Sequence, residues 1–159
     1  MNPNNYSILI LARGNELLGD EGVTVKAARA VKQNNRTGFE IDEMPVLNFS
    51  LLESIEGYNK VLLLDAIKIG DYKPGSVVQF SHEEYAYRIS NSPQNAGLPD
   101  LLLLAKRLEM KLPSEIRILA IEIEDSTVLS ESLSEQIEAA LPQFIEQIKE
   151  ILQQWGCAL

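Results

Sequence analysis

The sequence has little of the chemistry on which common hydrolytic and redox sites depend. It contains one histidine, His82, and one cysteine, Cys157. A single cysteine excludes an internal disulfide and a thiolate metal cluster. A single histidine excludes the H-E-x-x-H zinc motif, and it leaves His82 as the sole candidate base of a Ser-His-Asp triad. Cys157 lies in the tail, so we expect no Cys-His nucleophile. We interpret His82 as a surface or loop histidine.

Basic residues and long apolar runs are also scarce. There are 14 Lys and Arg against 23 Asp and Glu, a formal net charge of −9. This balance argues against nucleic acid and anionic membranes as partners, and it suits a solvated acidic surface, a basic partner or a metal ion. No apolar run approaches the roughly 20 residues of a membrane span. The first seven residues, MNPNNYS, do not resemble a signal peptide. We expect a cytoplasmic protein.

The 159 residues contain no Gly/Ser-rich or Pro-rich linker and no repeat, so residues 1–159 are expected to form a single domain. Hydrophobic residues make up 45% of the chain but aromatic residues only 6%, which predicts a largely aliphatic core.

Short apolar runs alternate with helical patterns along the chain. The predicted strands are residues 7–12, 39–44, 60–65, 76–80 and 115–123. The predicted helices are residues 22–33, 47–55, 98–107 and a long last helix that begins near residue 132. This alternation is typical of an α/β fold, and we expect a three-layer α/β/α sandwich with a mostly parallel, twisted sheet of about five strands.

The last helix has the clearest boundaries. Ser132 and Glu135 match an S-x-x-E capping box. Apolar residues then recur every three or four positions up to Trp155, which predicts one buried face. Pro142 is expected to kink this helix or weaken a turn, and Gly156 to end it.

Two acids stand where strands are expected to end. Glu21 follows the first strand in the turn GNELLGDEG, and Asp65 ends the strand KVLLLD. Parallel strands deliver such residues to one edge of a sheet, where α/β proteins hold ligands. The turn lacks the phosphate-binding glycine motifs, and its carboxylates favour a cation instead. Acids at strand ends also cap helices and hydrogen-bond turns, so this structural alternative stays open, above all for Asp20, a candidate cap of the first helix.

A third polar region, SNSPQNAGLPD, covers residues 90–100. Its composition predicts a loop followed by a helix start with Pro99 in the first turn. Asn91, Gln94 and Asn95 could face the same edge as the two acids.

In order along the chain, GNELLGDEGV, VLLLDAI, SPQNAGLPDLL and ILAIEIE followed by LSEQIEAALP resemble the motifs of the hydrogenase maturation endopeptidases. Members of that family clip the C-terminal extension from the large subunit of nickel–iron hydrogenases. The resemblance implies the same peptidase activity here, with a large-subunit precursor as the partner and nickel supplied by that substrate. It assigns no nucleophile, and we expect the chain to act as a monomer.

The resemblance also implies a ligand set. A glutamate, an aspartate and a histidine bind the metal in that family, and these positions fall on Glu21, Asp65 and Gln94. Gln94 departs from the pattern, because an amide oxygen is a much poorer nickel ligand than an imidazole nitrogen. Glu21 and Asp65 could share a proton as an aspartic-type dyad only if the site lacked metal.

Two alternatives to an active peptidase remain. One is a cleavage-deficient paralogue that binds the hydrogenase precursor, which the glutamine at position 94 would explain. The other is an unrelated flavodoxin-like protein that binds a small ligand, against which the order of the motifs argues.

Overall fold

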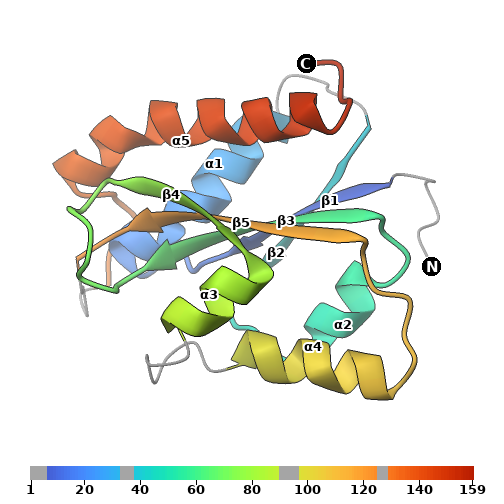
Figure 1. Cartoon of the computed structure of the whole chain (residues 1–159). Helices are drawn as coiled ribbons and strands as arrows, with labels where there is room; N and C mark the ends of the chain where they lie inside the picture. The colour runs from blue at the N-terminus through green and yellow to red at the C-terminus, as the bar shows by residue number, and fades with distance from the viewer. Residues whose placement is uncertain (1–6, 33–37, 90–96, 125–128) are drawn as a thin grey trace.

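The structure is a computed structural model that describes residues 7–32, 38–89, 97–124 and 129–159. Its centre is a five-stranded sheet in the order β2-β1-β3-β5-β4 (Figure 1). The strands are β1 (Ile8–Arg13), β2 (Glu40–Met44), β3 (Lys60–Ile67), β4 (Val77–Ser81) and β5 (Glu115–Glu122). Four strands are parallel, and β4 at one edge pairs with β5 in the antiparallel direction.

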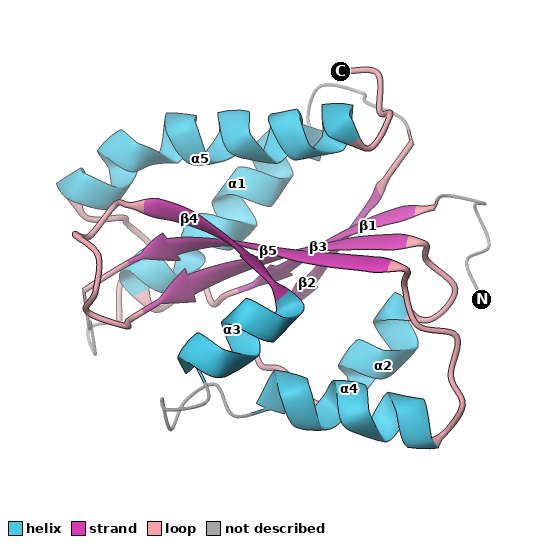
Figure 2. Ribbon diagram, in the orientation of Figure 1, coloured by secondary structure: helices cyan, strands magenta, loops and turns pink. Residues whose placement is uncertain are grey.

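Helices cover both faces of this sheet, as Figure 2 shows. One face carries α1 (Val23–Lys32) and α5 (Glu135–Gln154), and the other carries α2 (Ser50–Ile55), α3 (His82–Ile89) and α4 (Gly97–Arg107). The predicted α/β/α sandwich with a mostly parallel sheet is therefore confirmed.

Alternation along the central strands explains the two cores. In β1, Ile8, Ile10 and Ala12 pack beneath α1 and α5, whereas Leu9 and Leu11 face the opposite core. In β3, Leu62 and Leu64 join the first core, and Val61 and Leu63 join the second. Successive strand residues point to opposite faces. The next odd positions, Arg13 and Asp65, therefore belong on the face that carries α3.

The structure corrects the start of the last helix. The N-cap of α5 is Ser134, whose side chain accepts a hydrogen bond from the backbone N–H of Ile137. The predicted box of Ser132 and Glu135 is wrong, because Ser132 lies two residues before the cap. The helix continues without a break through Pro142. Gly156 follows it with a φ of +92°, in agreement with the predicted stop.

Helix α3 was not predicted from the sequence. Its segment HEEYAYRI is short and mostly polar, and Tyr85 has no exposed surface. Tyr85 packs edge-on against Phe80 of β4, with ring centroids 6.4 Å apart. Contact with the sheet, rather than an amphipathic pattern, therefore holds this helix.

The strands of the parallel set all end at the left of Figure 1, and we call this side of the sheet the carboxyl edge. In the ranges that the structure describes, no helix is both long and apolar enough to cross a membrane.

Candidate functional site

Asp65 lies at the carboxyl edge and is almost fully buried, with 2% of its surface exposed. The Arg13 guanidinium donates from Nη1 to both carboxylate oxygens, at 3.3 and 3.2 Å. The Tyr85 hydroxyl donates to Oδ2 of the same carboxylate. Strand β3 continues two residues beyond Asp65, so the predicted strand end at Asp65 is wrong by two residues. Residues of β1 and α3 thus meet the Asp65 carboxylate near the end of β3.

The environment of Asp65 acts on its charge in two directions. Burial raises the pKa of the Asp65 carboxyl above its ordinary value, and the Arg13 charge and the Tyr85 hydroxyl oppose this rise. Burial and the neighbouring carboxylate also raise the pKa of Tyr85, so its hydroxyl remains a donor at neutral pH. The buried charge of Asp65 is thus compensated inside the protein, as buried charges generally are.

Glu21 lies in a short 3₁₀ helix, η1 (Gly19–Gly22), between β1 and α1. Its Oε1 is 2.9 Å from Nζ of Lys68, which comes directly after β3. The Glu21 side chain is 30% exposed and the Lys68 side chain 19%. Glu21 and Asp65 therefore both lie at the carboxyl edge, as the sequence predicts, and each carboxylate contacts a basic side chain.

Asp20, beside Glu21, has a structural role, but at a different helix from the predicted one. Its carboxylate accepts hydrogen bonds from the backbone N–H and the hydroxyl of Ser134, at 2.7 and 2.9 Å. It thereby supports the start of α5 rather than that of α1. Ser130 adds backbone hydrogen bonds with Leu17 and Gly19. The turn that carries Glu21 is thus fixed to the segment before α5.

Gly14 explains why this turn can pass close to the end of β1. A Cβ atom at this position would collide with the backbone carbonyl of Glu21 and with the Thr24 hydroxyl. That hydroxyl donates to the carbonyl of Arg13 at 2.8 Å. Glycine at position 14 therefore sets the distance between the strand end and Glu21.

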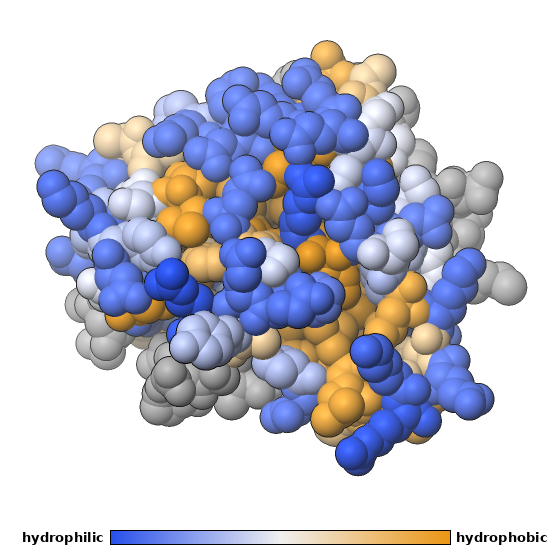
Figure 3. Space-filling model, in the orientation of Figure 1, coloured by the Kyte–Doolittle hydropathy of each residue, from blue (hydrophilic) through white to orange (hydrophobic). Residues whose placement is uncertain are grey.

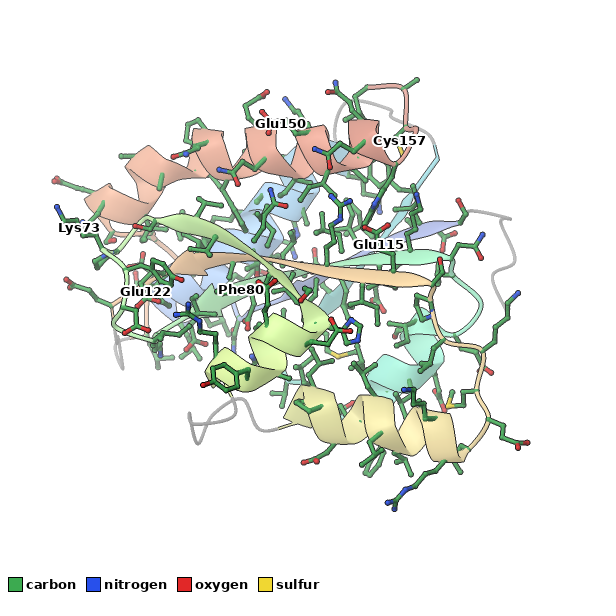
Figure 4. All side chains as sticks on the ribbon, viewed as in Figure 1. Lys73, Phe80, Glu115, Glu122, Glu150 and Cys157 are labelled. Atoms are coloured by element: carbon green, nitrogen blue, oxygen red, sulfur yellow. The ribbon has the colours of Figure 1, made fainter. Side chains whose placement is uncertain are left out.

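A second buried acid, Glu122, ends β5 at the same edge (labelled in Figure 4). Its carboxylate accepts backbone N–H groups of Ile69, at 3.1 Å, and of Gly70. These bonds hold the loop that follows Lys68. Glu122 falls within the predicted strand 115–123, but this contact cannot be read from the sequence, because it depends on where the loop after β3 turns.

The third predicted ligand, Gln94, lies outside the described residues, as do Asn91 and Asn95. Among the residues that the structure describes, no three His, Cys, Asp or Glu side chains group in a way that could hold a metal ion. The carboxylates of Glu21 and Asp65 are thus the two predicted ligands whose surroundings the structure gives.

His82 cannot supply an imidazole to the carboxyl edge. It begins α3 directly after β4, and the antiparallel direction of β4 puts Ser81 beside Arg117 near the start of β5. His82 therefore lies at the opposite side of the sheet, near the start of β5, where it borders a surface depression with Ser114 and Arg117. Its side chain is 41% exposed and lies 3.1 Å from Glu83, so it is a surface histidine at a helix start rather than in a loop.

The side chains that contact the two acids and that the sequence did not indicate are Arg13, Lys68 and Tyr85. Arg13 and Lys68 follow apolar strands, a pattern shared by many surface cations. Tyr85 belongs to a helix that was not predicted. The register of β1 against β3 pairs Arg13 with Asp65, whereas Lys68 reaches Glu21 from the loop after β3 and Tyr85 reaches Asp65 from α3.

Fold and site together define an α/β protein with an acidic, internally neutralised centre at the carboxyl ends of its strands. A family model described as hydrogenase maturation protease matches residues 46–151. The chain is 31% identical over 144 residues to Protein FrxA of Pyrococcus furiosus, covering 86% of this chain and 98% of that protein. It is 27% identical over 150 residues to the hydrogenase 2 maturation protease of Escherichia coli, covering 90% and 91%.

The fold gives the same result. The hydrogenase maturating endopeptidase HybD from E. coli superposes with a TM-score of 0.81 at 26% identity, covering 94% of each chain. Since the family model covers more than half of the sequence, this chain belongs to the hydrogenase maturation protease family. The resemblance read from the four motifs is confirmed, and the unrelated flavodoxin-like alternative is excluded.

Proposed function

We propose that this chain is an endopeptidase that removes the C-terminal extension of a nickel–iron hydrogenase large subunit after nickel insertion. The observation that carries the proposal is the buried Asp65 at the carboxyl edge, held in place by Arg13 and Tyr85. Family membership supplies the class of reaction and of partner.

In this proposal, nickel is part of the substrate. Glu21 and Asp65 offer carboxylate oxygens to it, and Gln94 offers an amide oxygen where the family has an imidazole. Docking on the metal would set the scissile bond beside the carboxyl edge. Hydrolysis then adds water across that amide, with the oxygen joining the carbonyl carbon and a proton joining the leaving nitrogen.

Exposed apolar side chains support protein docking at the same edge. Leu17, Phe49 and Leu129 are 51%, 69% and 77% exposed, and they lie on the segments that follow β1, β2 and β5. Apolar groups in solvent are characteristic of protein contact surfaces when they gather in one region. Figure 3 shows further apolar surface, which runs from the middle of the view down to α4, with another area below α5.

The direct test is to incubate the protein with a nickel-loaded large-subunit precursor and to follow the precursor by mass spectrometry. Loss of the mass of the C-terminal extension is expected. Glu21→Gln should reduce processing, whereas Glu16→Gln should leave it unchanged, because Glu16 lies in the same turn but pairs with Arg29. Normal processing by Glu21→Gln would remove Glu21 from the site.

A cleavage-deficient module that binds the precursor is the second candidate. Two observations favour it: basic side chains already neutralise both carboxylates, and the third ligand position is Gln94. This candidate predicts stable co-purification with the nickel-loaded precursor and no loss of mass. Gln94→His separates the two, because an imidazole should raise nickel affinity and restore cleavage if position 94 is a ligand.

A further inference from the structure

Basic side chains of this chain hold both carboxylates that are proposed to meet nickel. Arg13 Nη1 lies 3.2 Å from Asp65 Oδ2, and Lys68 Nζ lies 2.9 Å from Glu21 Oε1. The two pairs are built from separate segments: Arg13 ends β1, Lys68 follows β3, and Glu21 lies in η1. Each of the two carboxylates is thus neutralised by its own ion pair, and the two pairs come from different segments.

These contacts cancel the charge that would attract a metal ion. The formal charges of two carboxylates and two cations sum to zero, so these four groups attract a dissolved divalent cation much less than the two carboxylates alone would. Its approach also brings it close to two like charges. To coordinate either carboxylate, it has to displace an ion pair of the protein.

Burial makes this displacement harder for an ion in solution. The side chains of Arg13 and Asp65 are 16% and 3% exposed, so water screens their attraction less than at an open surface. The Lys68–Glu21 pair, at 19% and 30%, is more accessible. The easier pair to open is therefore Lys68–Glu21.

We infer that Arg13 and Lys68 are specificity-determining residues that exclude free divalent metal ions from Glu21 and Asp65. This inference rests on the proposed function, because it concerns the ligands that meet the substrate's nickel. A metal held in a docked precursor arrives at high effective concentration, and contacts elsewhere on the interface contribute to its binding. It can thus displace the two cations where a dissolved ion at the same total concentration does not.

The test measures binding of Ni²⁺ alone by isothermal titration calorimetry to the full chain. Lys68→Met is expected to raise Ni²⁺ affinity at least tenfold over the wild type, and Arg13→Met to raise it further. The control, Lys149→Met, removes the same charge from α5, where Lys149 pairs with Glu146, and should change nothing. Adding Glu21→Gln to Lys68→Met should abolish the gain.

Lys68→Met carries the test if Arg13→Met fails to fold, because a partly exposed pair contributes little to stability. Equal Ni²⁺ affinity in Lys68→Met and wild type overturns the inference, as does a gain that survives the added Glu21→Gln. If the proposed function is wrong and the inference is right, the outcome differs: the variants gain Ni²⁺ affinity, but the nickel-loaded precursor is neither bound nor cut.

Discussion

Arg13 and Asp65 are register partners on neighbouring parallel strands, and their side chains form an ion pair at the carboxyl edge. Both lie on the face that packs against α3, because each continues the odd-numbered series of its strand. Tyr85 then reaches the same carboxylate from α3. The position of a proposed nickel ligand is thus set by sheet register and by one helix contact.

The first prediction concerns Tyr85. Tyr85→Phe keeps the ring but removes a donor to a buried carboxylate, so the free energy of unfolding should fall by about 1–3 kcal/mol. Urea denaturation measures this change. Tyr87→Phe, at an 80% exposed position of the same helix, should change it by less than about 0.5 kcal/mol. Equal effects in both variants would contradict the role of the Tyr85 hydroxyl.

The second prediction concerns the approach of the turn to β1. Gly14→Ala forces a Cβ against the Glu21 carbonyl and the Thr24 hydroxyl, so it should destabilise the protein by about 1–3 kcal/mol and displace Glu21. Processing of the precursor should fall with it. Gly97→Ala is the matched control, because a Cβ there meets nothing within 4 Å. Wild-type stability in Gly14→Ala would show that the turn adjusts freely.

The third prediction separates Asp20 from its neighbour Glu21. Asp20→Ala removes two hydrogen bonds to Ser134 and should cost about 1.5–3 kcal/mol of stability. A double-mutant cycle with Ser134→Ala should give a coupling of about 0.5–3 kcal/mol. Ser132→Ala, at the serine that the sequence pattern indicates as the cap, should be nearly neutral. A coupling of zero would mean that the two residues act independently.

The fourth prediction tests the apolar side chains at the carboxyl edge. Phe49→Ser should weaken binding of the precursor by about tenfold, since exposed aromatic groups often dominate interface energies. Its effect on stability should stay within about 0.5 kcal/mol because Phe49 is 69% exposed. Leu108→Ser, 61% exposed beyond the end of α4, is the control. Equal loss of affinity in the two variants would argue against docking at this edge.

The fifth prediction concerns pH and Cys157. Burial raises the pKa of the Cys157 thiol, although the Lys60 charge partly opposes the shift. The folded state therefore holds the thiol proton to higher pH than the unfolded state, and stability declines as pH rises between the two pKa values. The rate of alkylation by iodoacetamide should rise at higher pH in folded protein than in urea. Coincident pH profiles would contradict this environment.

Much of the fold follows from the sequence because apolar periodicity is strong. The run KVLLLD predicts β3, and the spacing from Ile137 to Trp155 predicts the buried face of α5. Helix α3 escapes such reasoning because its segment is short and mostly polar, and its buried Tyr85 is held by contacts with Phe80 and Asp65. The cap of α5 was misplaced because Asp20, more than 100 residues away along the chain, supports Ser134 and not Ser132.

The candidate site was predictable only in part, because some of its contacts depend on how distant segments of the chain meet. Acids near or just beyond the carboxyl ends of parallel strands come to one edge, which places Glu21 and Asp65. Their partners Arg13 and Lys68 depend on register and on the path of a loop, and neither can be read from spacing. The prediction for Gln94 stays untested, because it lies outside the described residues.

The reversed direction of β4 limits how a histidine could be introduced at this site. The antiparallel direction of β4 carries His82 to the opposite ends of the strands, whereas Tyr85, one turn further along α3, contacts Asp65, so a histidine at position 85 would lie beside a proposed ligand. Other positions that can be engineered as imidazole donors follow β1, β2, β3 or β5 at the carboxyl edge. A histidine library confined to those segments is small enough to screen completely for nickel capture.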